Sequence, residues 1–165
     1  MLLVAFGLVV LNGLFVAAEF SFVKVRKTRM ELLAEDGQRS AKLALFGVRN
    51  LDAYLSVCQL GITLSSLGLG WLGEPAVAAL LRPLLEVAGI ANPALVSSLS
   101  VAVGFSLITF LHVVFGELIP KSISIQKAET TVLLLALPMR IFYLLCFPIV
   151  TVMNGISNFF LHLAG

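Results

Sequence analysis

Long apolar runs dominate the chain and are separated by short polar segments. A helix needs about 20 residues to cross the roughly 30 Å of membrane hydrocarbon, and three runs are long enough: residues 2–23, 51–72 and 94–119. A fourth run, residues 132–153, contains Pro138, Arg140 and Pro148. Because a charge near the middle of an isolated span is costly, we predict kinked interfacial helices over 128–165, with a fourth span as the alternative.

The segments between the spans carry weaker helical patterns. Residues 26–47 have apolar positions at helical spacing, and Asp36-Gly37 is the natural break between two short amphipathic helices on the membrane surface. In the 73–92 connection, prolines separate two short helices, 76–81 and 84–89. The sequence therefore predicts an all-α integral membrane protein, with three transmembrane helices per protomer and amphipathic juxtamembrane helices.

Composition supports the membrane assignment and excludes an ordinary soluble domain. Of the 165 residues, 59% are hydrophobic and 12% are charged, and the mean hydropathy is +1.05. Cys58 and Cys146 lie in apolar runs without metal-ligand spacing, so they indicate neither a zinc site nor a disulfide framework.

The positive charges indicate the orientation in the membrane. Seven Lys and Arg residues lie between positions 24 and 49, and Lys121 and Lys127 follow the third span. By the positive-inside rule, residues 24–49 and the region after residue 120 are cytoplasmic, with the N-terminus outside, in a multi-pass protein of the plasma (cell inner) membrane. This topology accounts for the basic cluster, so we expect no nucleic-acid partner.

The strongest chemical signal is Gly116-Glu117 followed by Pro120 at the end of the third span. Pro120 has no N–H to donate to the Gly116 carbonyl four residues back, so the sequence predicts an unpaired oxygen there. Glu117 places a carboxylate beside it, near or inside the membrane. A free carbonyl and a carboxylate together outline a site for a hard cation.

Further polar residues lie within the first span. Asn12 and Glu19 are seven residues apart and share a helix face, whereas Ser21 lies about 200° around the helix from Glu19. Hydrogen bonding between helices by Asn12, and extension of Glu19 towards Lys24, are the simpler alternatives to a cation site.

The second span carries a polar stripe. Gln59, Thr63 and Ser66 follow one face, and Ser65 adjoins it. Packing between helices explains the hydroxyls, but Gln59 requires another polar group. His112, five residues before Glu117, is interpreted as a core side chain with its hydrogen bonds satisfied.

Four separate segments of the chain resemble a known family. The matching segments, in chain order, are LFVAAEF at 14–20, RKTRMEL at 26–32, QLGITL at 59–64 and GELIPK at 116–121. Together they resemble the transmembrane domain of the CorC/CNNM (cyclin M) family, and the resemblance covers essentially all of residues 1–165.

The resemblance implies a homodimeric domain in the lipid bilayer that exports Mg²⁺, driven by inward Na⁺. It implies metal ligands at Ser21, Ser65, Ser66, the Gly116 carbonyl and Glu117. Weaker ion candidates are Asn12, Gln59 and Thr63, and the residues expected to have structural or gating roles are Glu19, Pro120 and Lys121.

Two other classes of function compete with transport. A membrane-anchored, dimerising Mg²⁺-binding or sensory module without transport is the alternative. An enzyme is not expected, because no metalloprotease-type, Ser/Lys or paired-aspartate motif occurs. Family members continue into cytoplasmic CBS and C-terminal domains, which these 165 residues do not include, so ATP is expected to act only through those domains.

Overall fold

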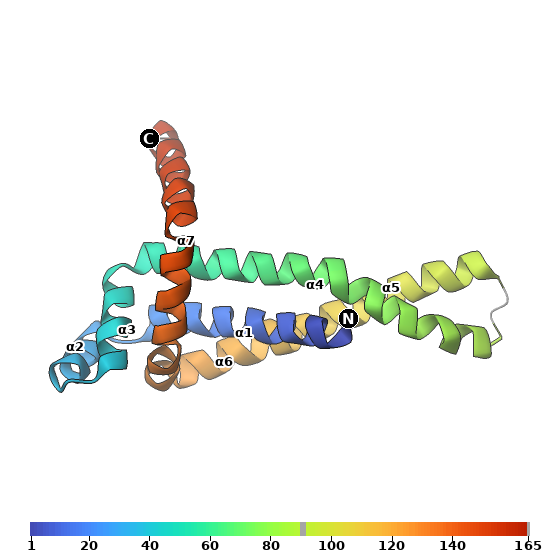
Figure 1. Ribbon diagram of the computed structural model, residues 1–165, viewed down its shortest axis with the longest axis horizontal. Coiled ribbons are helices and arrows are strands. Elements are labelled where there is room, and N and C mark those ends of the chain that lie inside the picture. Colours follow the sequence, from blue (N-terminus) through green and yellow to red (C-terminus); the bar gives the residue numbers. More distant parts are fainter. Residues whose placement is uncertain (90–91, 165) are drawn as a thin grey trace. The chain divides into compact units, whose positions relative to one another are not determined.

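The computed structural model describes residues 1–89 and 92–164, and every described element is helical (Figure 1). The helices are α1 (Leu2–Lys24), α2 (Lys27–Glu35), α3 (Arg39–Arg49), α4 (Leu51–Val87), α5 (Pro93–Leu111), the π-helix η1 (His112–Leu118), α6 (Ile119–Gln126) and α7 (Ala128–Ala164). The all-α prediction is confirmed.

The chain forms two compact units. Unit 1 comprises Met1–Gly13 and Ile62–Pro120, and unit 2 comprises Leu14–Gly61 and Lys121–Gly165.

The number of helices that could span a membrane differs from the predicted three. Four helical stretches are long and apolar enough by length and composition: Leu2–Lys24, Leu51–Leu85, Pro93–Gln126 and Ala128–Phe160. The first agrees closely with the predicted span, whereas the other three extend beyond the predicted boundaries.

The predicted helix end at residue 72, with separate helices at 76–81 and 84–89, is wrong. Helix α4 continues through Pro75 and Pro83 to Val87. An interior proline costs about 3 kcal/mol, but burial of the stretch around Val77 and Ala78 favours the continuous helix. A Cβ on Gly104 would lie 3.2 Å from the Ala78 backbone nitrogen, so α5 packs directly against this part of α4. Residues 90–91 of the predicted connection lie outside the described residues.

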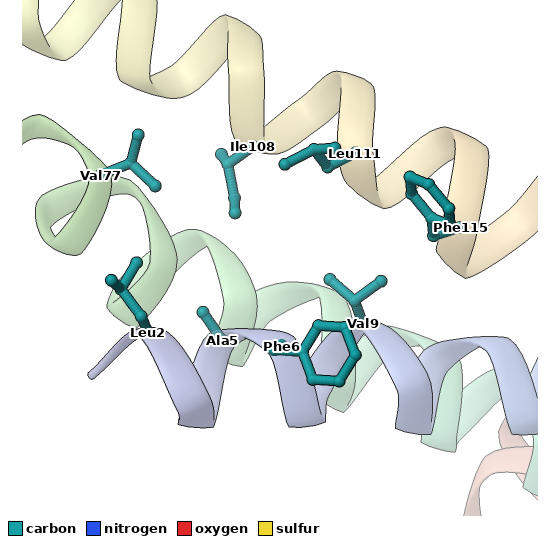
Figure 2. A pocket seen from close by; sticks show the side chains of 8 residues that line it. All are labelled: Leu2, Ala5, Phe6, Val9, Val77, Ile108, Leu111 and Phe115. Carbon is teal, nitrogen blue, oxygen red and sulfur yellow. The ribbon is translucent and has the colours of Figure 1, made fainter. Parts of the chain in front are cut away.

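The apolar core of unit 1 joins the N-terminal half of α1 to α4 and α5. Its buried members are Ala5, Val9, Leu69, Val77 and Ile108. Figure 2 shows the adjoining groove of about 270 Å³, whose lining is entirely apolar: Leu2, Ala5, Phe6, Val9, Val77, Ile108, Leu111 and Phe115. No polar group in that lining could replace the water around a cation.

In unit 2, the predicted break at Asp36-Gly37 is confirmed. Helix α2 ends at Glu35, Gly37 adopts a positive φ of 90°, and α3 begins at Arg39. A positive φ is accessible to glycine at little cost, so this residue suits a tight turn between helices. Placement of α2 and α3 on the membrane surface remains a prediction.

Helix α7 corrects the expectation of several kinked helices. Residues 128–164 form one helix that continues through Pro138 and Pro148. Its N-terminal end is held to α2, where Arg29 donates to both carboxylate oxygens of Glu129 at 3.0–3.1 Å. These hydrogen bonds raise the pKa of the Arg29 guanidinium above its ordinary value.

Helix α7 crosses α4 steeply. Ser56 and Cys58 are only two residues apart on α4, yet they contact Asn154 and Met139, which are fifteen residues apart on α7. At 1.5 Å per residue these separations are about 3 Å and 22 Å, so α7 lies across α4 rather than alongside it (Figure 1). Both the interfacial placement of α7 and the alternative of a fourth span remain predictions.

Arg140 avoids isolation in an apolar helix by stacking on aromatic rings. Its guanidinium carbon lies 3.9 Å from the Phe46 ring centroid on α3 and 5.4 Å from that of Tyr143. Tyr143 in turn stacks on Tyr54 of α4 at 5.1 Å. Because a cation over an aromatic face is stabilised electrostatically, these rings offset part of the cost of burying the charge, and they join α3, α4 and α7.

Candidate cation site

The Gly116 carbonyl lies in a widened helical turn of unit 1. In the π-helix η1, the Ile119 N–H bonds to the Val114 carbonyl, five residues back. Such turns occur often at functional sites. The sequence predicted an unpaired Gly116 oxygen, and this is wrong, because the Asn12 side-chain nitrogen donates to it at 3.0 Å.

Asn12 links three elements through both ends of its amide. Its Nδ2 donates to Gly116 on η1, and its Oδ1 accepts from the Ser66 hydroxyl of α4 at 3.2 Å. The Asn12 side chain is 0% exposed. We call these three residues the Asn12 network. The sequence ranked Asn12 as a weaker candidate, whereas it lies at the centre of the network.

Two glycines permit this close approach. A Cβ on Gly116 would lie 2.8 Å from His112 Cδ2 and 3.2 Å from Asn12 Nδ2. A Cβ on Gly13 would lie 2.9 Å from Pro120 Cγ and 3.3 Å from the Phe115 carbonyl oxygen. These distances are shorter than ordinary Cβ contacts, so larger residues at either position would push α1 away from η1.

Glu117 supplies the negative charge of this region. It follows Gly116 directly on η1 and is half-buried. The ion pairs formed among the described residues do not include the Glu117 carboxylate. A carboxylate thus lies next to the carbonyl that Asn12 holds.

The sequence predicted that His112 is a core side chain with its hydrogen bonds satisfied, and this is wrong for one of its two ring nitrogens. Its Nε2 is buried and has no hydrogen-bond partner within residues 1–89 and 92–164. The same atom lies 3.4 Å from the position that a Gly116 Cβ would occupy. The imidazole therefore borders the Asn12 network.

The other predicted ligands are distributed between the units. Ser65 is 2% exposed, and Thr63 is exposed; both belong to unit 1. Ser21 is buried in unit 2, where its hydroxyl donates to the Ala18 carbonyl oxygen at 2.9 Å. The structure therefore joins Ser66, Gly116 and Asn12 by hydrogen bonds, and the roles of the remaining residues as ligands stay predictions.

Lys121 contacts an aromatic ring. Its Nζ lies 4.7 Å from the Phe20 ring centroid in unit 2. This cation–π contact suits the predicted structural role of Lys121.

A second polar region lies in unit 2, in a groove between α1, α4 and α7. Two sequence candidates, Glu19 and Gln59, line it together with Ser56, Asn154 and Ser157. The α7 members, Asn154 and Ser157, are not among the site residues predicted from the sequence. The signal that could have found them is the spacing of Asn154 and Ser157, three residues apart and so on one face of an apolar helix.

Comparison with known proteins decides the family. The profile of the family described as "Cyclin M transmembrane N-terminal domain" matches residues 3–165. The chain belongs to the cyclin M (CNNM) family. The predicted resemblance is confirmed.

Bacterial relatives of this cyclin M domain are similar along nearly all of it. The UPF0053 proteins YhdT and YugS of Bacillus subtilis are 51% and 45% identical, over 90% and 99% of the chain. The protein Rv1841c of Mycobacterium tuberculosis is 38% identical over 99%. The chain spans 32%, 38% and 46% of the lengths of these three relatives.

Proposed function

We propose that this cyclin M domain carries Mg²⁺ across the plasma membrane, bound between its spans at the Gly116 carbonyl and the Glu117 carboxylate. The observation that supports this proposal most strongly is the π-helical turn η1. There the Gly116 carbonyl accepts a hydrogen bond from Asn12 of α1, directly beside Glu117. Family membership and the apolar helices support the same function. We further propose that the domain acts as a homodimer.

The chemistry of the Asn12 network suits a hard cation. Mg²⁺ requires oxygen ligands in near-octahedral geometry at about 2.0–2.1 Å. The network holds three such oxygens, on Asn12, Ser66 and Gly116, and Glu117 adds a carboxylate. Ser65, also in unit 1, adds a further hydroxyl that the family resemblance suggests.

Hydrogen bonds join the Asn12, Ser66 and Gly116 oxygens in the structure, and the proposed cation would replace these bonds. The Asn12 N–H that now points at Gly116 occupies the position where a cation would approach the carbonyl. We therefore expect Mg²⁺ to displace the Asn12 N–H and turn the Asn12 oxygen inward. One carboxylate leaves the bound Mg²⁺ with net positive charge, which limits its affinity and allows release.

Release on the opposite side would require the apolar part of unit 1 to open. Val9 is buried in α1, on the N-terminal side of Asn12. It forms one apolar cluster with Leu69 of α4 and Ile108 of α5. An apolar constriction excludes a hydrated ion. We propose alternating access, in which Na⁺ entering near Glu117 offsets the carboxylate charge and promotes Mg²⁺ export.

Replacing Ile108 with serine is expected to make the domain leaky. Ile108 is 9% exposed in the core that closes unit 1, and a hydroxyl there would favour water entry. Mg²⁺ flux from vesicles without a Na⁺ gradient should rise several-fold. Phe105→Ser, at an exposed position of the same helix, is the control. Equal Mg²⁺ leakage from both variants would show that the buried apolar core around Ile108 does not block the ion.

Replacing Pro120 with alanine should weaken Mg²⁺ binding. An alanine N–H could bond the Gly116 carbonyl and compete with the cation. A net hydrogen bond of about 1 kcal/mol corresponds to roughly a fivefold loss of affinity, measurable by calorimetry. Pro138→Ala, in α7, is the matched control. Unchanged Mg²⁺ affinity in Pro120→Ala would show that the missing N–H of Pro120 does not keep the Gly116 carbonyl available to the cation.

Flux measurements separate transport from the sensory-module alternative. The purified chain is reconstituted into sealed vesicles loaded with Mg²⁺, and external Mg²⁺ is followed with and without an opposing Na⁺ gradient. Transport predicts protein-dependent release that the gradient accelerates. Mg²⁺ binding without release would instead identify a binding or sensory module.

A further inference from the structure

We propose that the groove between α1, α4 and α7 in unit 2 binds a hard monovalent cation, Na⁺, with Glu19 as its charged ligand. The groove has a volume of about 370 Å³ and is lined by Glu19, Leu55, Ser56, Gln59, Met153, Asn154 and Ser157. The inference rests on the proposed function only where it takes Na⁺ as the coupling ion, for which this groove would be a binding site additional to the entry near Glu117.

The lining supplies the ligand chemistry of an alkali-metal site. Glu19 contributes a carboxylate, Gln59 and Asn154 contribute amide oxygens, and Ser56 and Ser157 contribute hydroxyls. Hard cations prefer such oxygen ligands. Five oxygen-bearing side chains from three helices thus border one groove, although the helices are otherwise largely apolar.

One contact already holds the groove together. The Ser56 hydroxyl lies 2.8 Å from Asn154 Oδ1 and 2.9 Å from the Asp52 carbonyl oxygen, and it can donate its single hydrogen to either. The Ser56 oxygen also carries lone pairs that can bind a cation, as does the amide oxygen of Asn154. This contact fixes α7 against α4 at the groove.

Charge favours a monovalent ion over Mg²⁺. Glu19 is half-buried, the lining contains no Lys, Arg or His, and the ion pairs among the described residues do not include Glu19. Na⁺ would neutralise the one carboxylate. Mg²⁺ would keep a net positive charge here, as it would at Glu117, so it would bind weakly, and it gives up its water reluctantly.

The site would connect Na⁺ binding to the position of α7. Because Asn154 and Ser157 belong to α7 whereas Glu19 and Gln59 belong to α1 and α4, a cation bound by all of them would hold α7 across the two other helices. Loss of the ion would remove that restraint.

The test measures Na⁺ binding directly, without Mg²⁺. The thermal unfolding midpoint of the purified chain in detergent is measured against NaCl, KCl and choline chloride at constant ionic strength. We expect a saturable rise with Na⁺ that exceeds the rise with K⁺ or choline. Glu19→Gln should weaken the apparent Na⁺ affinity about tenfold or more, since even outer-shell changes have effects of 10–100-fold, whereas Glu35→Gln, at an exposed position, should match the wild type.

A second variant tests the site by gain of function. Asn154→Asp adds a second carboxylate, so Mg²⁺ should compete with Na⁺ about tenfold more strongly than in the wild type. Equal responses to Na⁺, K⁺ and choline, or a Na⁺ response unaffected by Glu19→Gln, would overturn the proposal. An Asn154→Asp variant with unchanged Mg²⁺ competition would also overturn it.

The outcomes separate this site from the proposed transport. Retained Na⁺ binding in a chain that moves no Mg²⁺ would refute transport and leave the Na⁺ site intact. Mg²⁺ flux in a chain without specific Na⁺ binding would refute the Na⁺ site alone.

Discussion

Replacing Glu117 with glutamine is expected to lower Mg²⁺ affinity by at least about tenfold, since loss of a charged ligand should exceed the 10–100-fold effects of outer-shell changes. Glutamine keeps the size of the side chain and one carbonyl oxygen but removes the only negative charge beside the Gly116 carbonyl in η1. Calorimetric titration of the purified chain with MgCl₂ measures the effect.

The control for Glu117 must lose a carboxylate elsewhere. Glu35→Gln removes an exposed carboxylate at the end of α2, and its Mg²⁺ affinity should equal that of the wild type. A Glu117→Gln variant that binds Mg²⁺ as tightly as this control would remove Glu117 from the ligand set.

Replacing Asn12 is expected to have the second large effect, because this side chain joins α1, α4 and η1. Asn12→Leu preserves the approximate volume but leaves the buried Gly116 carbonyl without its donor, at a cost of about 1–3 kcal/mol in the free energy of unfolding. Denaturation in detergent without Mg²⁺ measures this loss. Ser66→Ala, which removes only the weaker bond to Asn12, should cost less.

An aspartate at the same position separates stability from cation binding. Asn12→Asp can still accept from Ser66, but it places a carboxylate where the Asn12 nitrogen now donates to Gly116. We expect lower stability without Mg²⁺ and a larger stabilisation by Mg²⁺ than in the wild type, about 1.4 kcal/mol for each tenfold gain in affinity. Equal Mg²⁺ stabilisation in both proteins would contradict a cation site at the Asn12 network.

Local sequence signals predicted the elements that local chemistry determines. The first helix was predicted from its apolar run, and the break at Asp36-Gly37 follows from glycine's access to positive φ. Neither of these predictions depends on contacts with a distant residue.

Tertiary packing determined what the sequence did not predict. Proline suggested helix ends near Pro75 and Pro138, but α4 and α7 continue because burial outweighs the local cost. The partner of Gly116 lies 104 residues away, and the hydrogen bond requires the close approach of α1 and η1. The contribution of Asn154 to a groove depends on α7 crossing α4, which no periodicity in either helix indicates.

The central claim is that Mg²⁺ crosses the membrane through this domain by way of Glu117. Its most direct test is Mg²⁺ release from sealed vesicles containing equal amounts of wild-type or Glu117→Gln chain, with an opposing Na⁺ gradient. We predict rapid release from wild-type vesicles and release from the variant no faster than from protein-free vesicles. Equal release from the wild type and the variant, or no release from either beyond that of protein-free vesicles, would contradict the claim.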